Sequence, residues 1–164
     1  MKRTCTGWAA LALVLSLSGI GHAEPTGEDK AAAESLFQEA LKLITLNNYP
    51  DACPKLEASN KLDPAVGALF NLGDCYEHTG RTASAWSLYL EIASQAKATN
   101  QPDREKKARD NAKALEPKLS KLTIEVASPA EGIEVKRNGT VVGQPTWGTP
   151  IPVDPGDLKI TAMA

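Results

Sequence analysis

The feature that most constrains this chain is a repeat in its first half. Shifting the sequence by 33 positions aligns residues of similar kind at six places. Self-similarity at this period is typical of stacked helical hairpins, because each hairpin needs a neighbour to bury its apolar side. Small aligned residues predict close approach of helices, and large ones predict filled gaps. The pairs are Leu36 and Leu69, Phe37 and Phe70, Ala40 and Gly73, Leu43 and Tyr76, Ala52 and Ala85, and Leu56 and Tyr89.

Apolar residues recur at the three- and four-residue spacing of amphipathic helices. The spacing predicts one helix over about 29–46 and a second over about 50–62. Asp63-Pro64 closes the second, since proline disfavours a helical conformation in the residue before it. The same plan then repeats, with Gly80 at the turn between the two helices of the second copy.

A third helical stretch follows residues 100–102 and carries a narrow stripe of alanine and leucine. Such a stripe suits a helix that covers the open end of a repeat stack. Pro117 lies within the stripe and predicts a kink or an early end near Glu116. The seven basic residues between Arg104 and Lys121 are interleaved with acids, which favours a solvated face over an anion site.

The second copy carries a recognisable motif, NLGDCYEHTGRTASAWSLY, over residues 71–89. It resembles the tetratricopeptide repeat, and the resemblance extends over residues 33 to about 97. The first copy departs from the motif, with Ala40 and Leu43 where the family favours Gly and Tyr. The resemblance implies a concave surface, built from the first helix of each hairpin, that holds a peptide or a helix of another protein. It places six residues there: Phe37, Leu41, Phe70, Asn71, Asp74 and Glu77. The alternative is that Phe37 and Phe70 are ordinary packing residues between helices.

At Leu122 the apolar period changes from 3.6 to 2, which predicts strands. The predicted strands are LTIEVA, IEVKR, TVVG and LKITA. Asn138-Gly139 between two of them predicts a hairpin, because both residues tolerate positive φ. Asn138-Gly139-Thr140 also fits the N-glycosylation pattern, but the turn accounts for these residues without modification.

The tail resembles the PEGA domain, a small β-sandwich module of microbial surface and envelope proteins. The resemblance covers residues 122–164, but the chain stops at Ala164, short of the final Gly-aromatic strand that the family usually has. An incomplete sheet would expose an edge that favours pairing with a partner. The matching features are Pro129, Gly132, the Asn138-Gly139 turn, Gly143, Gly148-Thr149-Pro150 and Asp154-Pro155-Gly156.

Residues 1–23 have the pattern of a secretory signal peptide: a basic end, a short apolar middle and a small-residue cleavage site after Ala23. A retained N-terminal anchor is the alternative. Cleavage predicts an extracytoplasmic product, periplasmic or secreted, with no membrane span. It leaves 16 basic against 20 acidic residues, a net charge of −4, which argues against binding of nucleic acid.

The predicted fold class is α+β, with two antiparallel helical-hairpin repeats and a capping helix before a small antiparallel β module. The expected organisation is a signal peptide over 1–23, a linker over 24–29, a helical repeat domain over 30–121 and a PEGA-like β module over 122–164.

Cys53, Cys75 and His78 are the only soft metal ligands after cleavage. The cysteines are 22 apart and form no Cys-x-x-Cys pair, so the set fits a zinc site poorly. His78 follows Cys75 by one helical turn, but nothing marks an oxyanion hole or an orienting carboxylate. The chain is therefore interpreted as non-enzymatic, without a metal or cofactor.

A disulfide between Cys53 and Cys75 is the preferred interpretation. In the repeat arrangement these residues lie on helices that pack across the junction between the two copies, and an oxidising compartment favours the bond. A reduced buried pair and redox chemistry are the alternatives. The first functional hypothesis is an envelope adaptor that binds another protein. The second is a structural or cell-wall-glycan-binding protein acting through the β module, and the third is a thiol redox protein.

Overall fold

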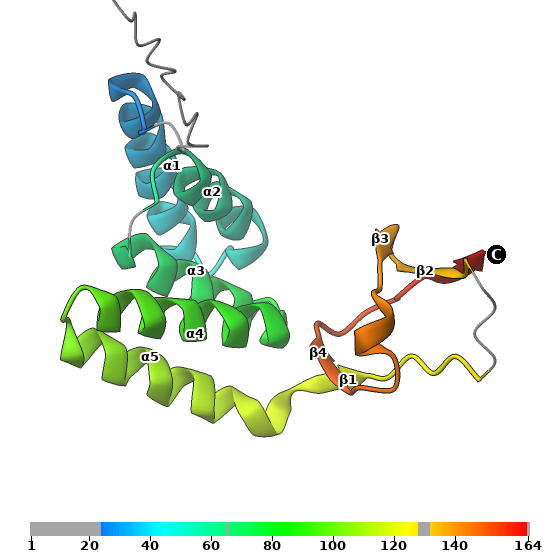
Figure 1. Cartoon of the computed structure of the whole chain (residues 1–164). Coiled ribbons are helices and arrows are strands. Elements are labelled where there is room, and N and C mark those ends of the chain that lie inside the picture. Colours follow the sequence, from blue (N-terminus) through cyan, green and yellow to red (C-terminus); the bar gives the residue numbers. More distant parts are fainter. Residues whose placement is uncertain (1–23, 65, 128–131, 164) are drawn as a thin grey trace, which may run out of the picture.

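The computed structural model describes residues 24–64, 66–127 and 132–163. The predicted signal peptide, with Cys5, lies outside them. The described residues form helices followed by small antiparallel sheets, so the predicted α+β class is confirmed (Figure 1). The helices are α1 (Gly27–Thr45), α2 (Tyr49–Leu62), α3 (Val66–His78), α4 (Thr82–Ala98) and α5 (Pro102–Leu115).

The first helix begins earlier than the sequence predicted. Asp29 N donates to Thr26 Oγ1 at 3.1 Å, and Thr26 N donates to Asp29 Oδ2 at 3.0 Å, so the two residues form a capping box. This reciprocal pair satisfies amide groups at the start of α1 that would otherwise lack partners. Most of the predicted linker 24–29 is therefore helix or its cap.

The first, third and fourth helices end in the same turn. The residues after their caps, Asn47, Gly80 and Asn100, have φ angles of 57°, 75° and 54°. The next amide in each turn donates to a carbonyl five residues back, as in Asn48 N to Leu43 O and Arg81 N to Tyr76 O. These are Schellman turns, which satisfy the last carbonyls of a helix while reversing the chain. Asn47 and Gly80 are 33 positions apart, so the repeat in sequence is also a repeat in backbone conformation.

Each helix packs against the next one along the chain, and two apolar clusters form between them. In the first cluster Ala40 of α1 and Leu56 of α2 are both fully buried. Their counterparts 33 positions later are Gly73 and Tyr89. A Cβ atom at Gly73 would lie 2.7 Å from Tyr89 Cε1. The larger side chain in the second hairpin is thus accommodated by a smaller residue opposite.

The fifth helix runs along α4 (Figure 1). It covers the second cluster with Ala108, Ala112 and Leu115. It ends at Leu115, where a short 3₁₀ helix, η1 (Glu116–Lys118), carries Pro117. The early end predicted near Glu116 is confirmed. Proline lacks the amide that would continue the α-helical bonding pattern.

The β module contains two antiparallel sheets, ordered β1-β4 and β3-β2-β5. Asn138 and Gly139 have φ angles of 49° and 83° and join β2 to β3, as the hairpin prediction requires. The strands are β1 (Ser120–Leu122), β2 (Glu134–Arg137), β3 (Thr140–Val141), β4 (Ile151–Val153) and β5 (Ile160–Met163).

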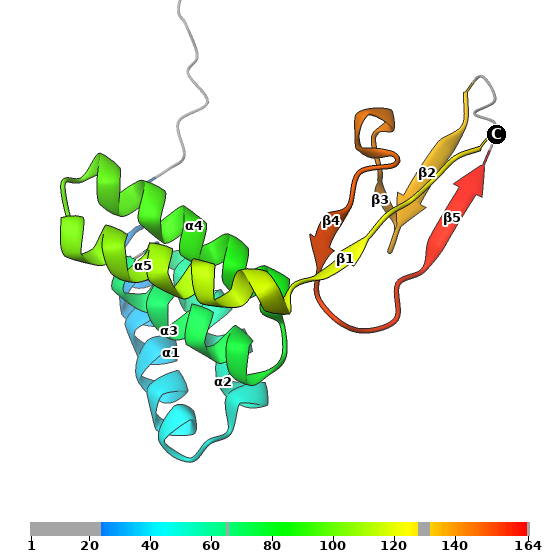
Figure 2. The ribbon, with the colours of Figure 1, turned by 90° about the horizontal axis from the view of Figure 1, so that it is seen from below.

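One strand prediction was wrong in position, and one strand was not predicted. The strand expected over LTIEVA is instead β1, which begins at Ser120 and ends at Leu122. Its partner β4 was not predicted, because Pro152 interrupts the apolar pattern there. Pro152 lies opposite Lys121 in a sheet of only two strands, where each strand has a free edge that can take a residue without an amide proton. Figure 2 shows the β module beside the helices, joined to them through η1 and β1.

Candidate functional site

The structure brings Cys53 of α2 and Cys75 of α3 together as a disulfide with a Cα–Cα distance of 5.7 Å. Both residues are buried, with 4% and 0% exposure, in the cluster shared by α1, α2 and α3. The predicted pairing therefore holds, and the bond ties the first hairpin to the second. In this form neither sulfur is a free nucleophile or metal ligand.

His78 does not form a catalytic pair with either cysteine, because its contacts are with Tyr49 and Asp74. Its ring stacks on Tyr49, with centroids 3.9 Å apart and planes 8° from parallel. Its Nε2 lies 3.7 Å from Asp74 Oδ1, and about half of each side chain is exposed. Over the described residues, His78 makes no hydrogen bond to either cysteine. In the same part of the chain, histidine, cysteine and acidic side chains form no group of three suited to a metal ion.

The six residues predicted for a partner-binding face come from α1 and α3. Phe37 is half-buried and packs on the first cluster, whereas Phe70 is half-buried and packs on the second. Leu41 and Asn71 are also half-buried, while Asp74 and Glu77 are exposed. The phenylalanines thus serve packing, as the alternative interpretation held, and each also leaves part of its ring uncovered.

Around Phe70 the face includes residues that the sequence did not suggest. Lys107 of α5 lies over the Phe70 ring, with Nζ 5.0 Å from the centroid, and the Tyr89 ring of α4 lies 6.2 Å from it. The Tyr89 hydroxyl donates to Glu77 Oε1 at 2.9 Å and is also hydrogen-bonded to the side chain of Asn111 in α5. We refer to Phe70, Asp74, Glu77, Lys107 and Asn111 as the α3–α5 face. Lys107 and Asn111 were missed because only the packing of α5 places them there.

Burial raises the pKa of Tyr89, and the hydrogen bond to Glu77 raises it further. The hydroxyl therefore remains neutral and is a fixed hydrogen-bond donor rather than a proton-transfer group. Glu77 is held in place by this bond, although its side chain stays exposed to solvent. The face thus combines aromatic, acidic and basic groups, and Glu77 among them is held by a hydrogen bond.

A hollow of about 270 Å³ adjoins Phe37 at the start of the helical part. Ala33, Phe37 and Ala68 supply apolar walls, while Lys30, Glu34 and Asp63 supply charge at the same hollow. Its floor includes Ser59, whose hydroxyl donates to Ala33 O at 2.8 Å and is thereby satisfied. The dimensions and walls suit one apolar side chain of a bound segment.

A polar cluster, separate from the α3–α5 face, joins the helices to the β module. Asp154, directly after β4, accepts from Ser84 N at 2.9 Å and from Ser84 Oγ at 2.5 Å. Helix α4 has no side-chain cap of its own at Arg81, so Asp154 caps it from 70 residues away. Arg81 Nε lies 3.8 Å from Asp154 Oδ2, and Arg81 Nη1 donates to Glu57 Oε1 at 2.6 Å. One arginine therefore connects α2, the start of α4 and the β module.

Asp154→Ala is expected to weaken this junction by about 1 kcal/mol, because an N-cap acceptor and an anion at a helix N-terminus are both lost. The measurement is amide hydrogen exchange at Ser84, which should become faster. Asp157→Ala is the control, since Asp157 lies three residues on and makes no hydrogen bond to α4 in the described structure. Unchanged exchange at Ser84 in Asp154→Ala would show that the carboxylate does not cap α4.

Tyr76 belongs to the same polar cluster, and the pKa of its hydroxyl depends on burial and on the contact with Glu57. Burial and a 2.9 Å hydrogen bond to Glu57 raise the pKa of Tyr76 from 10.0 to about 12. Because folding raises this pKa, the stability that the neutral hydroxyl contributes is full below about pH 10 and is lost as the pH rises through about 12. We expect Glu57→Gln to lower the Tyr76 midpoint towards 10, measured by tyrosinate absorbance with ellipticity recorded alongside. The tyrosinate absorbance change that is absent from Tyr76→Phe is the one that belongs to Tyr76. An unchanged midpoint of that change in Glu57→Gln would contradict the role of Glu57 in raising the pKa.

None of the helices in the described residues combines the length and apolar character required to cross a membrane. Comparison with known proteins found no matching family model, no matching curated protein and no matching solved structure.

Proposed function

We propose that this protein is a non-enzymatic, extracytoplasmic scaffold of the cell envelope that binds a segment of another protein on its helical part. The helical part is interpreted as two tetratricopeptide-like repeats with α5 as the capping helix, and the tail as a PEGA-like module. The predicted signal peptide over 1–23 supports the location, and the Cys53–Cys75 bond is of a kind that persists in oxidising compartments.

The observation that carries this proposal is the composition of the α3–α5 face. Phe70 is half-buried between Lys107 and Tyr89, so its ring is fixed in position and still partly open. Asp74 and Glu77 stand beside it as exposed carboxylates on the same helix. A rigid aromatic surface flanked by charge is typical of sites that hold a protein segment through a few anchoring side chains.

The charges indicate what kind of segment would fit. Asp74 and Glu77 favour a basic residue in the partner, whereas Phe70 and the hollow beside Phe37 favour apolar ones. Lys107 offers a counter-charge for one acidic residue. The expected partner is therefore an amphipathic segment with apolar anchors and mainly basic flanks.

Affinity capture from an envelope extract tests this function. Asp74→Lys reverses a charge on the face without touching the core, and we expect about a tenfold loss of partner binding, or about 1.4 kcal/mol. Glu91→Lys is the matched control, because Glu91 is an exposed carboxylate of α4 and lies outside the face. Equal capture by both variants would contradict the proposal. Binding to purified cell wall that survives Asp74→Lys, with no protein captured, would favour the glycan-binding alternative.

A further inference from the structure

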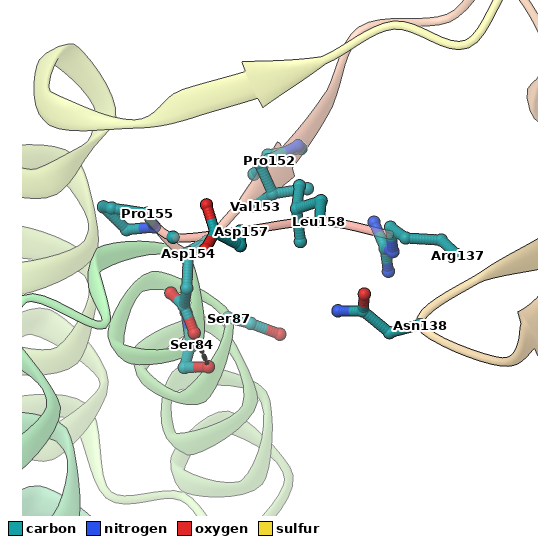
Figure 3. Close-up of a pocket in the computed structure, with 12 residues that line it drawn as sticks. Ser84, Ser87, Arg137, Asn138, Pro152, Val153, Asp154, Pro155, Asp157 and Leu158 are labelled. Carbon is teal, nitrogen blue, oxygen red and sulfur yellow. Dashed lines mark hydrogen bonds between the residues drawn. The ribbon is translucent and has the colours of Figure 1, made fainter. Parts of the chain in front are cut away.

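A larger hollow lies where the helices meet the β module, and the α3–α5 face plays no part in it. It has a volume of about 460 Å³, within the range of sites for small molecules or peptide ends. One wall is the first turn and a half of α4, with Ser84 and Ser87 (Figure 3). The other walls are the β2–β3 turn and the segment that follows β4.

Arg137, the last residue of β2, lines this hollow and has an unusual environment. Its Nη1 atom is buried and has no hydrogen-bond partner among the described residues. The backbone of Arg137 is fixed between two strands, since it pairs with Thr140 of β3 and with Ile160 of β5. A buried donor without a partner is unfavourable, and a guanidinium group pairs best with a carboxylate. The hollow is therefore lined by a guanidinium group that forms no ion pair with a carboxylate of the described residues.

The neighbouring groups supply further donors. Asn138 Oδ1 accepts from Lys159 N at 2.8 Å, which leaves its amide nitrogen free to donate. Figure 3 shows this nitrogen directed towards the side of the hollow where Ser87 lies. Ser87 is exposed, and its hydroxyl makes no hydrogen bond within the described part of the chain.

The two acidic groups of the hollow differ in their availability. Asp154 is engaged by Ser84 and by Arg81, so it does not compete for Arg137. Asp157 is exposed and makes no described ion pair. The hollow thus offers a site for an anion at Arg137, because neither of its two acidic groups forms a described ion pair with that arginine.

We propose that this hollow binds an α-carboxylate, through Arg137 with Asn138 and Ser87 as secondary donors. The carboxylate belongs either to a peptide C-terminus or to a free amino acid. Since Arg137 and Asn138 belong to the β module and Ser87 to α4, the ligand would link the two parts. This site does not depend on the function proposed for the helical face.

The test is an NMR titration of the full chain, labelled with ¹⁵N, with N-acetyl-alanyl-alanine. We expect saturable shifts at the backbone amides of Ser87, Arg137 and Asn138. The C-terminal amide of the same dipeptide should bind at least about tenfold more weakly, as should the acid to Arg137→Gln. Lys136→Gln is the matched control, because successive residues of a strand point to opposite faces of the sheet.

Free alanine and unacetylated alanyl-alanine distinguish the two sources. If alanine binds with the same dissociation constant as the dipeptides, the site is assigned to a free amino acid. If the dipeptides bind more tightly than alanine, the site is assigned to a peptide end. Absence of saturable shifts with every acid would overturn the proposal. Equal affinity for acid and amide, or unchanged affinity in Arg137→Gln with an intact spectrum, would overturn it as well.

Discussion

Replacing Cys53 and Cys75 together by alanine is expected to lower the free energy of unfolding by about 3 kcal/mol. The bond spans 22 residues and joins α2 to α3, so it limits the unfolded chain across the junction between the two hairpins. A small helical core gains much from such a link, because two hairpins bury few apolar side chains. The loss should appear as a lower urea midpoint.

Reduction of the wild-type protein provides the control for this effect. It breaks the bond but keeps both sulfur atoms in the core, so the difference between reduced protein and the double variant measures packing alone. Equal midpoints for oxidised and reduced protein would contradict a stabilising role. Mass spectrometry of protein from its native compartment tests the redox alternative, which requires a mixture of bonded and free cysteines rather than one bond that resists mild reductant.

Gly73→Ala is expected to destabilise the protein by up to about 2 kcal/mol, although alanine is normally the better helix former. The added Cβ would lie 2.7 Å from Tyr89 Cε1 and 2.8 Å from Tyr89 Cζ. Displacing the Tyr89 ring would cost free energy, because Tyr89 is only 2% exposed and its hydroxyl is hydrogen-bonded to Glu77. Overpacking of about 1–3 kcal/mol then exceeds the gain of about 1 kcal/mol in helix propensity.

The same substitution should change sign when Tyr89 is leucine. Tyr89→Leu with Gly73→Ala recreates the pairing of Ala40 with Leu56 in the first hairpin, where both residues are fully buried. In that background Gly73→Ala should stabilise by up to about 1 kcal/mol, since only helix propensity remains. Gly27→Ala is the control, because a Cβ at Gly27 has no neighbour within 4 Å. The same sign in both backgrounds, measured by urea denaturation, would contradict the steric explanation.

Much of the helical part could be predicted because its determinants are local. The spacing of apolar residues and the 33-residue shift predicted the hairpins, and Pro117 predicted the end of α5. The early start of α1 also had a local cause that was overlooked, since Thr26 and Asp29 have the spacing of a capping box.

The features that escaped prediction depend on residues distant in sequence. Asp154 caps α4 across 70 residues, and no local pattern marks such a contact. Lys107 and Asn111 join the face only because α5 folds back along α4. Strand β4 was missed because Pro152 is tolerated in a two-stranded sheet, which the sequence around it does not reveal.

Photo-crosslinking in the native compartment tests most directly whether the helical face binds a protein. A photoreactive amino acid replaces Asp74 on the face and, in a matched variant, Glu91 of α4; both are exposed helical carboxylates. We predict a discrete protein adduct from position 74 and none from position 91. Adducts of equal yield at the two positions, or none at position 74, would contradict binding at this face.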